Sequence, residues 1–182
     1  HVRNLGMEFG IWVEPEMINP DSDLYRAHPD WLLAVPEYNQ PTGRNQYALD
    51  LQNPDVFAYL LERLYDLLNR YDISYIKWDM NREIVQPGHE GKAAITGQTH
   101  AVYRLFDELR VRHPLVEIES CASGGGRIDF EVLKRTHRFW TSDNNDALER
   151  QQIQRGMSYF FPPEVMGSHI GSAHCHCTAR SH

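Results

Sequence analysis

Two aspartates, Asp79 and Asp143, each follow a short apolar run of strand length. A carboxylate at the end of a buried strand is costly to desolvate unless a partner or a substrate uses its charge. Two such carboxylates facing one pocket can hydrolyse a glycosidic bond, because one attacks the anomeric carbon while the other protonates the leaving oxygen. The alternative is that each aspartate caps the helix that follows it, a task that Asn144, Asn145 and Asp146 could also perform beside Asp143.

Lys77 precedes Asp79 by two positions, so on an extended strand the two side chains point to the same face. The Lys77 ammonium would favour the ionised form of Asp79, which a nucleophile requires. Trp78, between them, is expected to point the other way, into a layer of helices. A lysine at a strand end can also form a Schiff base, which makes an aldolase the rival enzymatic interpretation. The acidic neighbour argues against it, because it favours the protonated lysine.

Other residue groups near the predicted strand ends suggest binding. Residues 121–127 read CASGGGR, and glycines let a backbone approach a ligand closely. Trp12, Trp78 and Trp140 could stack on a sugar ring, although such residues more often belong to the core. The segment His174-Cys175-His176-Cys177 places its histidines and cysteines on opposite sides of an extended chain, which makes a poor tetrahedral cage. We therefore expect no metal site and no cofactor.

The composition argues against several classes of protein. Asp and Glu outnumber Lys and Arg by 25 to 18 and no basic run occurs, which argues against nucleic acid or an anionic membrane surface as a partner. No apolar run approaches the roughly 18 residues that a membrane-spanning helix needs. The cysteines number only 3, an odd count that does not suit a disulfide-stapled secreted domain, so we expect a reducing compartment, the cytoplasm.

Strand-length and helix-length patterns alternate along the chain. The predicted strands are residues 7–13, 73–78, 115–120, 138–141 and the start of a fifth at 165–170. The predicted helices are residues 54–71, 99–112, 128–135 and 147–161. The first strand is a continuous apolar run, as expected of a parallel strand buried on both faces. Alternation of this kind predicts βα units and a parallel sheet.

The position of the polar residues favours one α/β architecture. Each predicted strand ends in polar or reactive side chains, whereas an open sheet collects its chemistry at one switch point. We therefore predict a (β/α)8 TIM barrel. A full barrel takes about 250 residues, so four to five βα units make a partial one. The Pro-rich stretch 18–44 is long enough to be either functional or disordered.

The two ends suggest a piece of a longer protein. Residues 2–5 read as the tail of a helix that Gly6 ends, and the last predicted strand has nothing after it to pack against. We expect residues 1–182 to be a fragment of a (β/α)8 catalytic domain.

Five segments carry a further signal. They are GIWVEPEM at 10–17, GRNQYALDLQNPDV at 43–56, YIKWDMNR at 75–82, ESCASGGGRID at 119–129 and FWTSDNNDALERQQIQ at 139–154. In this order and spacing, they resemble the catalytic domain of the retaining α-galactosidases of glycoside hydrolase family 36. Glycosidases of family 31 share the tryptophan and aspartate context of the third segment but not the cysteine-glycine or SDN segments.

The resemblance implies roles for individual residues. Asp79 would be the nucleophile that forms a covalent galactosyl intermediate, and Asp143 the acid/base. The implied substrate-binding residues are Trp12, Arg44, Lys77, Asn81, Cys121, Gly124 and Gly125. The implied activity is hydrolysis of terminal α-galactosyl residues from oligosaccharides of the raffinose or melibiose type.

The resemblance also leaves alternatives open. Transglycosylating raffinose and stachyose synthases and α-N-acetylgalactosaminidases use the same two carboxylates, and a hydrolase is preferred among them. An inactive sugar-binding fragment is a different class of interpretation, because a partial parallel sheet leaves two unpaired edges. The family's first barrel strands, with an aspartate pair that binds galactose, and its flanking β-domains are expected to lie outside residues 1–182. Members of the family are often homo-oligomers.

Overall fold

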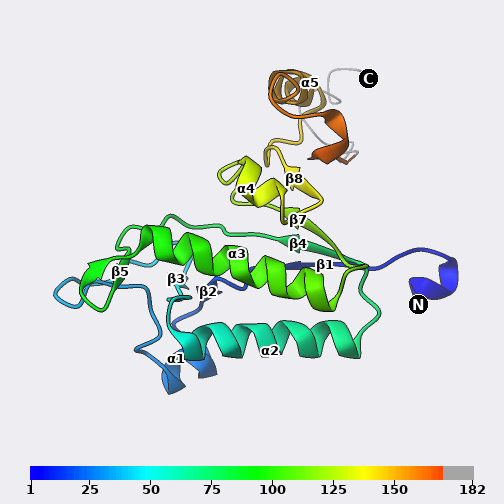
Figure 1. Ribbon diagram of the computed structural model, residues 1–182. Coiled ribbons are helices and arrows are strands. Elements are labelled where there is room, and N and C mark those ends of the chain that lie inside the picture. The colour runs from blue at the N-terminus through cyan, green and yellow to red at the C-terminus, as the bar shows by residue number, and fades with distance from the viewer. Residues whose placement is uncertain (170–182) are drawn as a thin grey trace.

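A parallel five-stranded sheet forms the centre of the molecule, which is a computed structural model that describes residues 1–169 (Figure 1). The strands are β1 (Gly10–Val13), β4 (Tyr75–Trp78), β7 (Glu117–Ser120), β8 (Arg138–Trp140) and β9 (Met166–Gly167). The helices that follow the first four strands are α2 (Pro54–Arg70), α3 (Ile95–Arg112), α4 (Phe130–Leu133) and α5 (Ala147–Met157). Each strand pairs in parallel with the next one along the chain. Four βα units and a fifth strand in this order form part of a (β/α)8 barrel, as predicted.

The shorter elements lie in the connections. Two antiparallel hairpins join β2 (Met17–Ile18) to β3 (Tyr47–Ala48) and β5 (Gly88–His89) to β6 (Lys92–Ala93). The remaining helices are α1 (Asp23–Ala27) and two 3-10 turns, Arg3–Leu5 and Pro163–Val165. The Pro-rich stretch 18–44 is folded, not disordered, because Trp31 and Leu33 within it are buried.

Helix α2 forms as the local sequence predicts. The Asn53 side chain accepts a hydrogen bond from the Asp55 amide at 2.9 Å, and Pro54 occupies the first helical position. Its buried face consists of Val56, Leu60, Leu64 and Leu68. Figure 1 shows α2 and α3 side by side along one face of the sheet. Their apolar faces and the inner strands make one core.

Strand β1 differs from the prediction. It begins at Gly10, and it is not buried on both faces, since Ile11 and Val13 are half-buried while Trp12 is 53% exposed. The reason is its place at the edge of the sheet. Within residues 1–169, β1 pairs with β4 alone, so its other side has no neighbouring strand.

Several element boundaries also differ. Helix α3 starts at Ile95, before the predicted Thr99, because the buried Gln98 side chain bonds the backbone of Leu49 and Leu51 at 2.9 Å each and so fixes the first turn. Helices α4 and α5 are shorter than predicted. The last strand comprises only Met166–Gly167, because residues 168 and 169 are not part of a strand, and residue 170 lies outside the described residues. Across residues 1–169, none of the helices has the length and apolar character needed to cross a membrane.

Candidate active site

The carboxyl ends of β1, β4 and β7 meet at one edge of the sheet. Trp12 pairs with Lys77, and Lys77 pairs with Glu119, so these three residues form a row across the strands. The ladder continues one step further, because the Asp79 amide donates to the Val13 carbonyl at 2.9 Å and the Cys121 amide to the Trp78 carbonyl at 2.8 Å. Asp79 and Cys121 therefore continue the hydrogen-bonded ladder of the sheet.

Asp79 is 6% exposed and sits in a ring of donors. Its Oδ2 accepts from Trp12 Nε1 at 3.0 Å and from Asn81 Nδ2 at 2.7 Å, and its Oδ1 accepts from the Met80 amide at 2.8 Å. The Cys121 thiol donates as well. Burial raises the pKa of the Asp79 carboxyl, but the four hydrogen bonds outweigh burial and bring the pKa below its usual value. Asp79 is thus ionised, as a nucleophile has to be.

Cys121 complements this arrangement. Burial, followed by the hydrogen bond to Asp79, raises the pKa of the Cys121 thiol to about 12. The thiol therefore keeps its proton at neutral pH and remains a donor to the carboxylate. Cys121 is 1% exposed, so it is a fixed part of the wall behind Asp79.

Lys77 has two close partners that the sequence does not predict. Its Nζ pairs with Glu119 Oε1 at 3.2 Å and lies 4.0 Å from the centroid of the Trp140 ring. Hydrogen bonds are the largest influences that lower the pKa of Asp79, and a contribution from Lys77 stays a prediction. Geometry explains why Lys77 pairs with Glu119, because residues two apart on a strand are separated by about 7 Å, whereas Glu119 is the direct cross-strand neighbour. Trp78 does point into the helix layer, as predicted, where its ring packs against Phe106 of α3.

Asp143 lies in the loop between β8 and α5. Its Oδ1 accepts a hydrogen bond from Trp140 Nε1 at 3.0 Å, and the residue is exposed. The helix-cap alternative is wrong for Asp143, because Asp146 caps α5 by accepting from the amides of Leu148 and Glu149. The carboxyl of Asp143 is therefore available to a ligand in solution.

The glycines of the loop 121–127 are expected to let the backbone approach a ligand, and they also allow close packing within the protein. Gly124 has a φ of 83°, and a Cβ at that position would lie 2.9 Å from the Asp143 amide nitrogen. A Cβ at Gly125 would lie 2.7 Å from the Thr141 carbonyl oxygen. The loop packs tightly against the segment that carries Asp143, and only glycine allows this approach.

Arg44 stands apart from the other predicted binding residues. It is exposed at the tip of a tight turn, where Arg44 and Asn45 have φ values of 53° and 58°. Within residues 1–169, no hydrogen bond or ion pair links its side chain to the other predicted site residues. The turn itself is tied to the site, because Gln46 Nε2 donates to Glu14 Oε2 at 2.6 Å and Asn81 donates to the other oxygen of Glu14.

The family assignment rests on the whole chain. The model of the Melibiase family matches residues 1–182. The chain belongs to the Melibiase family. This Melibiase chain is 70% identical to the alpha-galactosidase of Escherichia coli over 182 residues, which are 100% of the chain and 26% of that enzyme.

Solved structures agree with the resemblance to family 36. The crystal structure of the GH36 alpha-galactosidase AgaA from Geobacillus stearothermophilus matches with a TM-score of 0.91 and 41% identity, covering 96% of this chain and 25% of that one. A variant of AgaA in complex with raffinose matches with a TM-score of 0.92 and 40% identity, covering 97% and 25%. The Melibiase chain thus spans about a quarter of the length of these relatives.

Three carboxylates of this Melibiase chain were not among the predicted site residues. Glu14 bonds Asn81, Glu16 is 1% exposed, and Glu119 holds Lys77. All three lie at the carboxyl ends of β1 and β7, and this position in the sequence is the signal from which they could have been predicted.

A metal centre is not evident in the described part of this Melibiase chain. Residues 1–169 contain no group of three or more His, Cys, Asp or Glu side chains that could hold a metal ion. The segment 174–177 lies outside the described residues.

Proposed function

We propose that the protein is an α-galactosidase that removes terminal α-galactosyl residues from oligosaccharides with retention of configuration. The observation that carries this proposal is Asp79, a buried carboxylate kept ionised by four hydrogen-bond donors at the end of a barrel strand. The names of the relatives support the activity, and the AgaA variant in complex with raffinose supports an oligosaccharide substrate.

Two displacements at the anomeric carbon account for retention. In the first, Asp79 attacks this carbon and the bond to the leaving oxygen breaks, while Asp143 gives its proton to that oxygen. A covalent galactosyl ester of Asp79 results. In the second, Asp143 takes a proton from water, the water oxygen attacks the anomeric carbon, and the Asp79 carboxylate leaves.

The surrounding side chains suit this sequence of steps. The orientation of the attacking carboxylate is fixed by the hydrogen bonds that it accepts from Trp12, Asn81 and Cys121. Lys77 uses one of its three donors for Glu119, which leaves the others for sugar hydroxyls. We assign Arg44, Gly124 and Gly125 to sugar binding from the family resemblance.

Replacement of the nucleophile tests the proposal. In the protein expressed from its complete reading frame, Asp79→Asn should lower kcat on an aryl α-galactoside by at least about 10⁴-fold, with an unchanged near-UV circular dichroism spectrum. Asp72→Asn is the matched control, because Asp72 is exposed and forms an ion pair with Arg3 at the surface. The control should keep wild-type activity.

Two results would contradict the proposal in different ways. Wild-type turnover by Asp79→Asn would remove Asp79 from the role of nucleophile. A folded wild-type protein that cleaves no α-galactoside would reject the activity itself.

A further inference from the structure

Glu16 connects three parts of the site from a buried position. It is 1% exposed, and its Oε1 accepts from Trp78 Nε1 at 2.8 Å and from Arg127 Nη1 at 2.7 Å. Its own carbonyl accepts from the Leu49 amide at 2.9 Å, so its backbone is fixed too. Glu16 therefore links the segment after β1 to β4, one residue before Asp79, and to the end of the loop that follows β7.

The loop 121–127 reaches both predicted catalytic carboxylates. At its start, Cys121 donates to Asp79, and in its middle Gly124 packs against the Asp143 amide. Internal hydrogen bonds make the loop stiff, because the Ala122 amide donates to the Gly124 carbonyl at 2.9 Å and the Ala122 carbonyl accepts from the Gly126 amide at 3.1 Å. A displacement at the end of a stiff loop is passed on to its middle.

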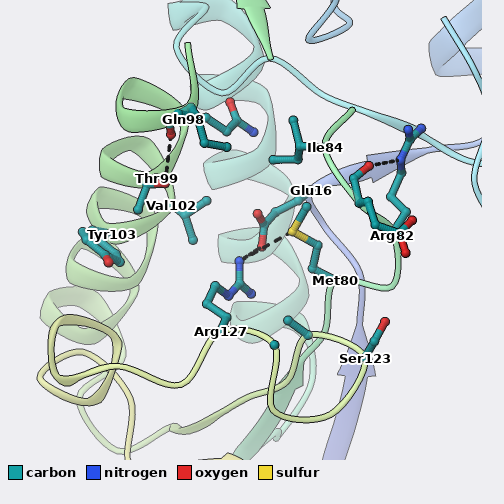
Figure 2. Close-up of a pocket in the computed structure, with 14 residues that line it drawn as sticks. Glu16, Met80, Arg82, Ile84, Gln98, Thr99, Val102, Tyr103, Ser123 and Arg127 are labelled. Atoms are coloured by element: carbon teal, nitrogen blue, oxygen red, sulfur yellow. Dashed lines mark hydrogen bonds and ion pairs between the residues drawn. The ribbon is translucent and has the colours of Figure 1, made fainter. Parts of the chain in front are cut away.

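The Arg127 guanidinium, at the end of this loop, has few hydrogen-bond partners. A cavity of about 440 Å³ separates the loop from α3, and Figure 2 shows Arg127 extending beside it toward Glu16. The Nε and Nη2 atoms of Arg127 have no hydrogen-bond partner in the described part of the chain. The orientation of the guanidinium therefore rests mainly on Glu16, with a weaker contact from Nη1 to the Met80 Sδ at 3.9 Å.

We propose that Glu16 is a positioning residue that, through Arg127, sets the placement of Asp143 relative to Asp79. The proposal rests on the proposed function, because it assigns no activity of its own. Retaining glycosidases need their carboxyl groups about 5 to 5.5 Å apart, and a misplacement of about 1 Å can cost roughly 100-fold in rate. The buried ion pair of Glu16 and Arg127, here called the tether, lies at the end of the loop and is suited to keep such a separation.

Glu16→Gln tests the tether in the protein expressed from its complete reading frame. We expect kcat per folded molecule to fall by about 10- to 100-fold, with a smaller change in KM. The loss should be larger for raffinose than for an aryl α-galactoside with a good leaving group, because the latter needs less help from the Asp143 proton. A merely structural role would lower the folded fraction and leave kcat per folded molecule, and the ratio between substrates, unchanged.

Glu16→Gln leaves a buried guanidinium without its anion, which can prevent folding. In that case, two further variants test the role of Glu16. The double variant Glu16→Gln/Arg127→Met removes both charges and should show the same loss of kcat. Arg127→Lys keeps the charge pair, so its kcat should lie between that of the double variant and that of the wild type. Wild-type kcat in both variants would overturn the proposal.

A surface ion pair supplies the control. Arg135 follows α4 and pairs with Asp107 of α3 at 3.0 Å, and Arg135→Gln should keep wild-type kcat. Failure of this inference is distinguishable from failure of the proposed function. If the wild type is active, Asp79→Asn is inactive and the Glu16 variants have wild-type kcat, only the role of Glu16 is rejected.

Discussion

Each predicted catalytic carboxylate accepts a hydrogen bond from a tryptophan indole. The distance is 3.0 Å both from Trp12 to Asp79 and from Trp140 to Asp143. Trp140 is 4% exposed and carries the Lys77 ammonium over its ring, whereas Trp12 is half exposed. These tryptophans are donors that orient carboxylates, a role beyond the core packing and sugar stacking that the sequence suggests.

The thiol of Cys121 offers a test of how Asp79 stays ionised. The pKa of Asp79 is lowered, so activity that needs the ionised carboxylate is present above this pKa and lost as the pH falls through it. Cys121→Ala removes one donor and raises the pKa of Asp79, so the acidic limb of the pH profile of kcat/KM should move to higher pH. Cys121→Ser keeps a hydrogen-bond donor, so its acidic limb should stay closer to that of the wild type. Equal profiles for the two variants would show that this hydrogen bond does not matter.

At the scale of elements, the parts predicted best are those whose causes are local. Helix α2 follows from a cap, a proline and an apolar spacing within one short stretch. The start of α3 differs from the prediction because Gln98 bonds Leu49 and Leu51, which are distant in sequence. The role of Glu16 could not be predicted for the same reason, because its donors Trp78 and Arg127 become its neighbours only in the folded barrel.

The loop 121–127 is the element in which a small substitution should affect activity most. Gly124→Ala places a Cβ against the Asp143 amide, so kcat should fall by about 10- to 100-fold. Gly91→Ala is the matched control, because Gly91 has a similar φ of 73° but no atom within 4 Å of the added Cβ. Both variants should lose about 1 to 2 kcal/mol of stability from the left-handed backbone, measured by denaturant unfolding. Equal activity of the two variants would contradict the close packing of the loop on Asp143.

At the scale of the whole molecule, the edge strand β1 indicates how the barrel continues. We propose that residues 1–182 are part of a (β/α)8 catalytic domain in which another strand pairs with the free side of β1. The strand carries Trp12, and Ile11 and Val13 are only half-buried within residues 1–169. The cytoplasmic location and homo-oligomerisation stay predictions.

Hydrogen exchange tests this continuation. In the protein expressed from its complete reading frame, the β1 amides that face away from β4 should exchange as slowly as those of β7, because a new ladder protects them. In residues 1–182 expressed alone, the same amides should exchange fast while β7 remains protected. Fast exchange at β1 in both samples would argue against a neighbouring strand.

The covalent intermediate on Asp79 is the central claim, and trapping it is the most direct test. A fluorinated galactosyl fluoride forms the glycosyl ester of a retaining enzyme but slows its hydrolysis, so the ester can be located by peptide mass spectrometry. We predict one galactosyl label on the peptide that contains Asp79, and none in the Asp79→Asn variant. A label on another residue, or turnover with inverted configuration and no label, would contradict the account.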